Sequence, residues 1–295
     1  MWLVTGAQGQ LGKSLTRLLE NSSIEFTGTS SQELDITSKY LVQEFISELK
    51  PSVIINTAAW TDVDGAESNL EAAMKVNADG ALHLAISAKK ISAQFVHIST
   101  DYVFSGQALS PWQEDNLRAP ISVYGKTKAR GEVLVMDEYP EGSCIVRTAW
   151  LYSQWGRNFA KTMTKLALFG QGEVKVVTDQ IGQPTSAVDL ATQIVASLTA
   201  QVEPGIYHGT NSGQASWFDF ATAIFQACDA ETDRLIPTDS SSFVRPAQRP
   251  AYSVLGHARW HREVESKNQV SPMRNWELAL SELMPQIIAT VKSEE

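Results

Sequence analysis

The chain has 295 residues, 43% of them hydrophobic and 19% charged, which is the composition of a globular protein with one large or two smaller domains. Its net charge of -9 argues against a broad nucleic-acid-binding surface. We also expect no membrane attachment, because no apolar run approaches the roughly 20 residues that span a bilayer and the N-terminus lacks signal-peptide features. The two cysteines, Cys144 and Cys228, are far apart, and we expect buried thiols in a cytoplasmic protein.

The first element is a short apolar strand at residues 2–4, which runs into a glycine-rich segment and then into an amphipathic helix. Gly6 would permit a tight turn, Gly9 would let the backbone approach a pyrophosphate, and Gly12 would let the helix pack against the strand. The helix N-terminus would then face the phosphates. An ordinary turn is the alternative, but the strand–glycine–helix order predicts a dinucleotide site.

A second strand is expected at residues 24–27, and the segment after it, residues 28–31, contains no acidic residue. A carboxylate there would hold the ribose 2′-hydroxyl of NAD and repel a 2′-phosphate, so its absence favours NADPH, with NADH still possible. Asp35 follows this segment. It could receive the adenine amino group or cap a helix that begins near Thr37, and the sequence leaves both open.

Two further strands, at residues 52–56 and 94–100, have the continuous apolar character of a buried parallel sheet. Small residues follow the first, as expected where a flat cofactor passes the C-terminal edge of the sheet. The hydroxyls of Ser99 and Thr100 end the second. The helix expected at residues 69–90 carries Asn77, which could reach the active-site backbone or cap an inter-helix contact.

Tyr124 and Lys128 are four residues apart, which places both side chains on one face of a helix. An ammonium beside a phenol can lower the phenol pKa below its usual value of about 10 and suit it to protonate an alkoxide. Such pairs also occur by chance. The glycine-rich segment and the Thr100 hydroxyl precede this pair in the order that a hydride-transferring enzyme needs, so we predict a catalytic role.

The second half alternates between the sheet and a smaller unit. We expect a helix at 158–169, a strand at 174–177 that returns to the sheet, a covering helix at 187–199, a strand at 205–208, and helices at 217–228 and 276–291. The fold class is therefore α/β: a Rossmann-type, doubly wound parallel sheet formed by residues 1–148 and 174–203, with a smaller C-terminal substrate-binding domain of residues 149–173 and 204–295. Arg245 and Arg249 lie in a proline-ordered loop that suits a diphosphate, or is simply a solvated basic loop.

Three motifs carry a resemblance to a known family: residues 5–12 (Thr-Gly-Ala-x-Gly-Gln-Leu-Gly), 99–104 (Ser-Thr-Asp-Tyr-Val-Phe) and 124–128 (Tyr-Gly-x-Thr-Lys). They resemble the extended short-chain dehydrogenase/reductases and, more narrowly, the dTDP-4-dehydrorhamnose reductases. Residues 147–152, 158–163 and 179–185 extend the match over nearly the whole chain.

The resemblance implies that NADPH reduces the 4-keto group of dTDP-4-dehydro-L-rhamnose, giving the dTDP-L-rhamnose used in cell-surface polysaccharide such as lipopolysaccharide. Tyr124 would protonate the oxyanion, Lys128 would lower the tyrosine pKa and bind the nicotinamide ribose, and Thr100 would donate to the same sugar oxygen. The implied cofactor contacts are Gly6, Gln8, Gly9, Gln10, Leu11, Thr29, Ser30, Asp35, Ile36, Ala58, Ala59, Thr61, Asn77, Ser99, Tyr124 and Lys128. The implied substrate contacts are Val63, Thr100, Asp101, Tyr102, Phe104, Trp150, Arg245 and Arg249, although Trp150 could equally be a core residue.

Three other functions compete with this one. A sugar-nucleotide dehydratase would carry an Asp-Glu pair after the threonine, where this chain has Asp101-Tyr102. An epimerase would recycle bound NAD, which the missing acid at residues 28–31 disfavours. A non-catalytic NADP-binding subunit, like the regulatory subunit of methionine adenosyltransferase, remains possible, although intact Thr100, Tyr124 and Lys128 argue against it.

Some of these reductases dimerise around Mg²⁺ held by glutamates. Here Ser14 stands at one of those places and a second carboxylate, Asp189, is shifted by one residue. Because a hard cation needs several oxygen ligands, we expect no Mg²⁺-centred dimer and instead a monomer or a weak homodimer.

Overall fold

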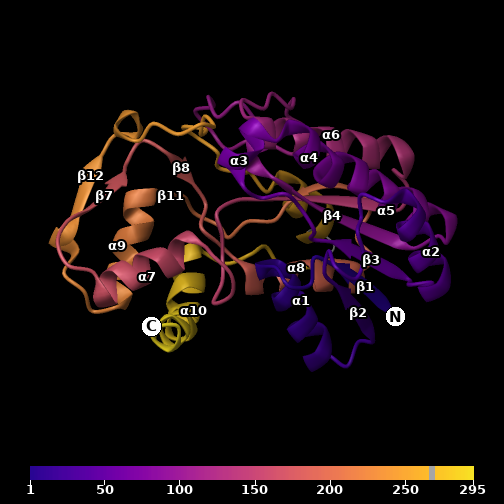
Figure 1. Cartoon of the computed structure of the whole chain (residues 1–295), viewed down its shortest axis with the longest axis horizontal. Helices are drawn as coiled ribbons and strands as arrows, with labels where there is room; N and C mark the ends of the chain where they lie inside the picture. The colour runs from indigo at the N-terminus through magenta and orange to yellow at the C-terminus, as the bar shows by residue number, and fades with distance from the viewer. Residues whose placement is uncertain (266–269) are drawn as a thin grey trace.

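A computed structural model describes residues 1–265 and 270–295 (Figure 1). Its main element is a six-stranded, fully parallel sheet in the order β10-β5-β4-β3-β1-β2. The strands are β1 (Trp2–Thr5), β2 (Phe26–Thr29), β3 (Val53–Asn56), β4 (Gln94–Thr100), β5 (Ser143–Thr148) and β10 (Gly205–His208). All four residues of β3 are buried, as expected for a parallel strand covered on both faces. The predicted Rossmann-type sheet is confirmed.

Helices cover both faces of this sheet (Figure 1). On one face α1 (Gln10–Asn21) packs beside α8 (Ala187–Thr199), and their shared apolar cluster includes Leu15, Leu19, Leu190 and Ile194. On the other face lie α2 (Lys39–Leu49), α5 (Gly80–Lys90) and α6 (Val123–Glu138). In α1, α2 and α8 the apolar residues recur on one side, so burying that stripe against the sheet fixes the layer. The buried side of α6 instead includes Lys128 and Glu132.

The helix predicted at residues 69–90 is present, but it is interrupted. It comprises α4 (Leu70–Met74), a π-helical turn η1 (Lys75–Asp79) and α5. Single π-turns inside helices often occur at functional sites, because the extra residue turns one side chain inwards. Here the turn contains Asn77, which is fully buried.

The second half of the chain builds a separate apolar core around α7 (Phe159–Phe169), α9 (Trp217–Ala227) and α10 (Trp276–Ser293). Three short ribbons flank these helices: β7 (Val174–Val177) with β12 (Leu235–Thr238), β8 (Ile181–Gly182) with β11 (Ala215–Ser216), and β6 (Leu151–Tyr152) with β9 (Thr185–Ser186). The remaining elements are α3 (Val63–Ser68), the 3₁₀ turns η2 (Asp101–Val103), η3 (Thr232–Arg234) and η4 (Ser240–Ser242), and the π-turn η5 (Trp260–Val264).

Two strand expectations are wrong. The strand at 174–177 does not return to the main sheet but pairs with β12, and the strand at 205–208, assigned to the smaller unit, joins the main sheet beside β5. The burial of each strand gives the reason: β7 has one buried residue of four, which suits a two-stranded ribbon. In β10, Tyr207 packs on Trp260 and His208 hydrogen-bonds with the Gly256 carbonyl, and both are almost fully buried.

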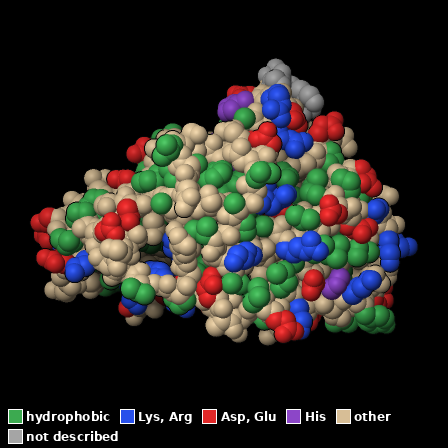
Figure 2. All heavy atoms as spheres, turned by 90° about the horizontal axis from the view of Figure 1, so that it is seen from above, with side chains coloured by type: hydrophobic (Ala, Val, Ile, Leu, Met, Phe, Trp, Pro, Cys, Tyr) green, Lys and Arg blue, Asp and Glu red, His purple; other side chains and the backbone are tan. Residues whose placement is uncertain are grey.

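In the part of the chain that the structure describes, no helix is both long enough and apolar enough to cross a membrane. Acidic and basic side chains are interspersed on the face shown in Figure 2.

Candidate functional site

The glycine-rich segment lies at the point where the strand order reverses, because β2 and β3 lie on opposite sides of β1. Ligands of open α/β sheets bind at such a point. Gly6 has φ of +70°, and a Cβ there would lie 2.6 Å from the Ala58 backbone nitrogen; at Gly12 it would lie 2.2 Å from the Gly6 carbonyl oxygen. These two positions admit no side chain, as the sequence predicts. The loops after β1 and β3 therefore form the floor of one crevice.

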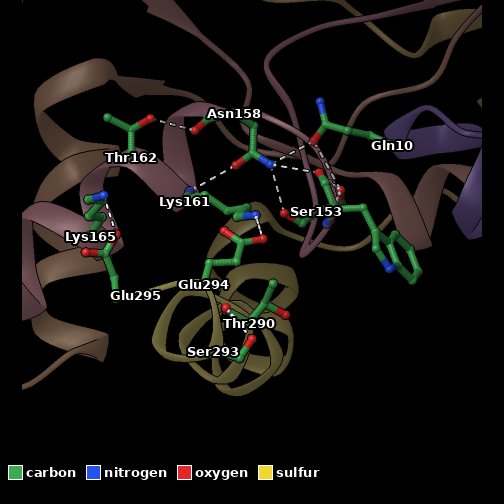
Figure 3. Close-up of polar contacts among 11 residues, drawn as sticks. Gln10, Ser153, Asn158, Lys161, Thr162, Lys165, Thr290, Ser293, Glu294 and Glu295 are labelled. Carbon is green, nitrogen blue, oxygen red and sulfur yellow. Dashed lines mark hydrogen bonds and ion pairs between the residues drawn. The ribbon is translucent and has the colours of Figure 1, made fainter.

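The start of α1 is open to an anionic ligand. Its N-cap residue, Gly9, supplies no side-chain hydrogen bond to the first turn, so the backbone N–H groups there can donate hydrogen bonds to a phosphate. The Gln10 side chain, predicted to contact the cofactor, already makes hydrogen bonds within the protein. Its Oε1 accepts hydrogen bonds from Ser153 Oγ (3.1 Å) and Asn158 Nδ2 (2.9 Å), which tie this segment to the start of α7 (Figure 3).

The end of β2 differs from the expectation. Glu33 folds back so that its Oε2 accepts the Ser30 N–H at 2.7 Å, and this hydrogen bond lowers the pKa of the Glu33 carboxyl. The prediction that no carboxylate lies at this strand end is therefore wrong, because a turn brings in an acid from three residues further along. Thr29 is buried, and its hydroxyl has no hydrogen-bond partner in the described residues.

Asp35 caps a turn before α2, with its Oδ1 accepting both the backbone N–H and the hydroxyl of Thr37. This is the capping alternative that the sequence left open, and the helix N-cap itself is Ser38. Leu11 and Ile36 are core residues that are 4% and 5% exposed. They can therefore meet a cofactor only through their backbone, whereas Gln8, Ala58, Ala59 and Thr61 lie at least partly exposed.

Asn77 connects the crevice to the helix that bears Tyr124. Its Oδ1 accepts the Trp60 N–H at 2.9 Å, and its Nδ2 donates to the Trp60 carbonyl and to Thr127 Oγ1. The Asn77 side chain is fully buried and its amide holds the backbone of the loop after β3, which is the first of the two alternatives that the sequence left open. Its direct contact with the cofactor stays a prediction.

The three predicted catalytic residues come together at the C-terminal edge of the sheet. Thr100 ends β4, in register with Thr148 of β5, and Tyr124 lies in the first turn of α6, which Ser122 caps by accepting the Gly125 N–H. A Cβ on Gly125 would lie 2.2 Å from the Tyr102 carbonyl oxygen, so glycine allows α6 to approach the turn after β4. The rings of Tyr102 and Tyr124 meet edge to face at 5.6 Å.

The electrostatics of Tyr124 reverse one expectation. Burial raises the pKa of Tyr124 to about 12, only partly offset by a hydrogen bond with the Thr100 hydroxyl. The predicted lowering by Lys128 is wrong for this arrangement, because the Lys128 ammonium turns away and donates to the Ile98 carbonyl at 2.6 Å. Burial lowers the pKa of Lys128 itself to about 8. The phenol is therefore protonated at neutral pH, which is the form that donates a proton.

A chain of buried polar groups behind Lys128 was missed by the sequence reasoning. Asn56 Oδ1 accepts Thr5 Oγ1 and the Ala58 N–H, which fixes the amide so that its Nδ2 donates to His97 Nδ1 at 3.0 Å. His97 Nε2 then lies 3.4 Å from Lys128 Nζ. The available signal was the period-2 spacing of His97 and Ser99 along β4, which puts both side chains on one face of the strand.

Ser99 belongs to a second missed group. Its hydroxyl donates to Glu132 Oε1 at 2.5 Å, and the same carboxylate binds Arg147 through two hydrogen bonds of 2.9 and 2.8 Å and Arg118 through one of 2.6 Å. Successive strand residues point to opposite faces, so Ser99 faces α6 while Thr100 faces the crevice. The Ser99 hydroxyl is therefore engaged away from the cofactor, and the cofactor contact predicted for this residue stays a prediction.

Among the predicted substrate residues, Phe104 is a core residue, and its substrate contact stays a prediction. It is 1% exposed, stacks on Trp112 at 4.7 Å and lies under the Arg147 guanidinium. Asp101 is also buried, and its Oδ1 accepts the Thr100 hydroxyl at 2.9 Å. Burial raises the pKa of the Asp101 carboxyl to about 6, although hydrogen bonds from Ser253 and Thr100 lower it in part.

Trp150 is half-buried two residues after β5 and has φ of +45°, an unusual conformation for a bulky residue. Its indole stacks on Trp217 with ring centroids 3.6 Å apart, and a Cβ on Gly182 would lie 2.4 Å from it. Strain held in place by packing of this kind is common where a side chain serves a ligand.

The two positions compared above with the magnesium ligands of related reductases, Ser14 and Asp189, make other contacts. Ser14 donates to the Gln10 carbonyl, and Asp189 forms a two-point ion pair with Arg274 at 2.9 Å. Within residues 1–265 and 270–295, no group of three or more His, Cys, Asp or Glu side chains could hold a metal ion.

A family model described as "RmlD substrate binding domain" matches residues 1–288. Two curated relatives are each 42% identical to this chain. The one from Streptomyces antibioticus, a probable dTDP-4,6-dihydroxy-2-methyloxan-3-one 4-ketoreductase, aligns over 98% of this chain and 96% of its own. The one from Streptomyces griseus, a dTDP-4-dehydrorhamnose reductase, aligns over 96% and 93%.

Among solved structures, the dTDP-4-dehydrorhamnose reductase of Bacillus anthracis in complex with NADP superimposes with a TM-score of 0.91 at 36% identity. The match covers 97% of this chain and 98% of that one.

Proposed function

Because the chain belongs to the RmlD family, whose curated relatives include dTDP-4-dehydrorhamnose reductases, we propose that it reduces the 4-keto group of dTDP-4-dehydro-L-rhamnose to give dTDP-L-rhamnose. The observation that carries this proposal is that Thr100 ends β4 and Tyr124 lies in the first turn of α6, close enough for the Thr100 hydroxyl to affect the Tyr124 pKa, at the sheet edge where the glycine-rich segment also lies.

Each of the three residues has a distinct part in that reaction. Tyr124, whose phenol stays protonated, donates its proton to the oxygen that becomes anionic at the sugar 4-position. Thr100 holds that oxygen through its hydroxyl, once the hydroxyl turns from Asp101. Lys128 lies one helical turn after Tyr124, and we propose that its buried amine leaves the Ile98 carbonyl to bind the ribose when the cofactor is bound.

The crevice fits a nicotinamide dinucleotide, since side chains are excluded at Gly6 and Gly12 and the first turn of α1 is uncapped. NADPH supplies the hydride when bound there. We propose Gly6, Gly9, Gln8 and the loop at 58–61 as its contacts, and Val63, Tyr102, Trp150 and the arginine loop as contacts of the dTDP-sugar. The sheet half would hold the cofactor and the helical half most of the substrate.

We further infer that the protein works in the cytoplasm as a monomer or weak homodimer, without a nucleic-acid partner. The two cysteines are free thiols, which suits a reducing compartment.

The direct test is consumption of NADPH by the purified protein with dTDP-4-dehydro-L-rhamnose, followed by identification of the product. We expect stoichiometric formation of dTDP-L-rhamnose. Tight NADPH binding with no turnover would instead support a non-catalytic NADP-binding role. Turnover of only other 4-keto dTDP-sugars, of the kind named for the Streptomyces antibioticus relative, would keep the chemistry and change the substrate.

A further inference from the structure

The arginine loop, residues 245–250, rests against the short helix α3 rather than standing free. Asp64 in α3 makes all the polar contacts between them. Its Oδ1 accepts Arg249 Nη1 at 2.9 Å and the Ala247 N–H at 3.2 Å, and its Oδ2 accepts Arg249 Nη2 at 2.8 Å. Arg249 Nη1 also donates to the Ala247 carbonyl within the loop. One carboxylate thus takes three N–H donors from one loop.

The two arginines are not equivalent. Arg249 is 15% exposed and meets Asp64 in the two-point geometry that a guanidinium forms with a carboxylate. Arg245 is 57% exposed, and its closest approach to Asp64 is 3.7 Å. Within the described residues Arg245 makes no hydrogen bond. If Arg249 left Asp64 to bind a phosphate, it would leave a partly buried carboxylate without its partner, which is costly.

The loop is also placed close to the reacting end of the site. The charges of Arg249 and Asp64 both influence the pKa of Tyr102, whose ring touches that of Tyr124. One helical turn further along α3, Glu67 Oε1 accepts the Val123 N–H at 2.8 Å, immediately before Tyr124. Helix α3 therefore holds the arginine loop with one carboxylate and the start of the catalytic helix with another.

We propose that Asp64 is a positioning residue for substrate binding: it fixes the 245–250 loop through Arg249, so that Arg245 alone binds the diphosphate of the nucleotide-sugar. This inference rests on the proposed function for its ligand class. The proposal assigns different roles to Arg245 and Arg249, which the sequence analysis gives as equivalent substrate contacts.

The test measures the dissociation constant of dTDP, which carries the diphosphate without the reacting sugar, by calorimetry on the full-length protein and its variants. We expect Asp64→Ala and Arg249→Lys each to weaken dTDP about tenfold, since a point charge cannot reproduce the two-point contact. Arg245→Ala should weaken it by a similar factor in the wild-type background but by little in the Asp64→Ala background. The NADPH dissociation constant should not change in any of them.

The sign of the Asp64→Ala effect decides between the two arrangements. If Arg249 were itself the diphosphate ligand, removing Asp64 would free it and tighten dTDP, which would overturn the inference. Asp189→Asn breaks a two-point pair of the same geometry with Arg274 elsewhere in the molecule, and it should leave dTDP binding unchanged. Amide hydrogen exchange of residues 245–250 measures the order of the loop without any ligand. We expect faster exchange in Asp64→Ala than in the wild-type protein.

Failure of this inference can be told from failure of the proposed function. If the wild-type protein binds dTDP and Asp64→Ala binds it equally well, only the inference falls. If the wild-type protein binds no dTDP, the proposed substrate class falls and the inference falls with it.

Discussion

Two charged regions of this molecule are built in opposite ways. Beside the catalytic helix, Glu132 and Arg147 are at most 1% exposed and bind each other through two hydrogen bonds. At Arg245 and at the end of α10, charged groups lie at the surface. Arg245 is 57% exposed, and Glu294, which pairs with the less exposed Lys161 (Figure 3), is 55% exposed.

The difference in burial between the two regions explains why the Glu132–Arg147 region is the more rigid one. A buried ion pair cannot exchange its partner for water, so breaking it leaves an unpaired charge at high cost. Although burial alone would raise the pKa of Glu132, Arg147, Arg118 and Ser99 lower it overall, so the carboxylate stays ionised. An exposed pair competes with water and salt and is worth little by itself. The buried pair can therefore keep the catalytic helix in a fixed position, while the exposed charges can change partners when a ligand binds.

The largest expected effect is on the chemical step. Tyr124→Phe should lower the turnover number by about 10² to 10⁴, because the general acid is lost while the fold and the NADPH site remain. Steady-state kinetics with dTDP-4-dehydro-L-rhamnose measures this. Tyr152→Phe removes a buried hydroxyl in the separate apolar core and serves as the control. Equal turnover by wild type and Tyr124→Phe would remove the tyrosine from the mechanism.

The second largest effect should come from breaking the buried ion pair between Arg147 and Glu132. Arg147→Met should lower the free energy of unfolding by about 3–5 kcal/mol, because Glu132 would keep a buried charge without its main partner. In contrast, Lys161→Met, which removes the pair with Glu294, should cost less than about 1 kcal/mol. Denaturant unfolding of both variants gives the comparison directly. Similar losses would show that burial does not separate the two regions.

A pH effect should come from Asp101. Its folded pKa of about 6 lies above its ordinary value of 3.8, so the folded state holds a proton that the unfolded state has lost between those values. The contribution of this group is complete below pH 3.8 and is lost as pH rises through 6, a fall of about 3 kcal/mol. Asp101→Asn should lack this fall. We would measure unfolding of both proteins from pH 4 to 7, and parallel curves would contradict the expectation.

The smallest effect should be at the exposed carboxylate beside β2. Glu33→Gln should tighten NADPH relative to NADH by up to about fivefold, because a like charge near the 2′-phosphate is removed. Fluorescence titration of both cofactors measures the ratio. An unchanged ratio would mean that Glu33 does not face the ribose.

Several features could be predicted from local sequence alone. The glycine spacing, the buried strand predicted at residues 52–56 and the helix that carries Tyr124 and Lys128 each depend on neighbours within a few residues, and the structure contains all three, although Lys128 does not lower the Tyr124 pKa. The resemblance motifs added the identity of Thr100 as the partner of Tyr124, which the structure supports through their hydrogen bond.

The sequence by itself therefore determined the parallel sheet, the dinucleotide crevice and the Tyr–Lys face, because hydrophobic period, glycine geometry and helical spacing are local. Only the tertiary structure decided which groups meet across long stretches of chain. The Glu33 carboxylate accepts the Ser30 N–H, and the Ser99 hydroxyl donates to Glu132. Residues 205–208 pair with β5 in the main sheet, and Arg249 binds Asp64. These partners follow from packing and desolvation of groups far apart in sequence, and no local pattern encodes them.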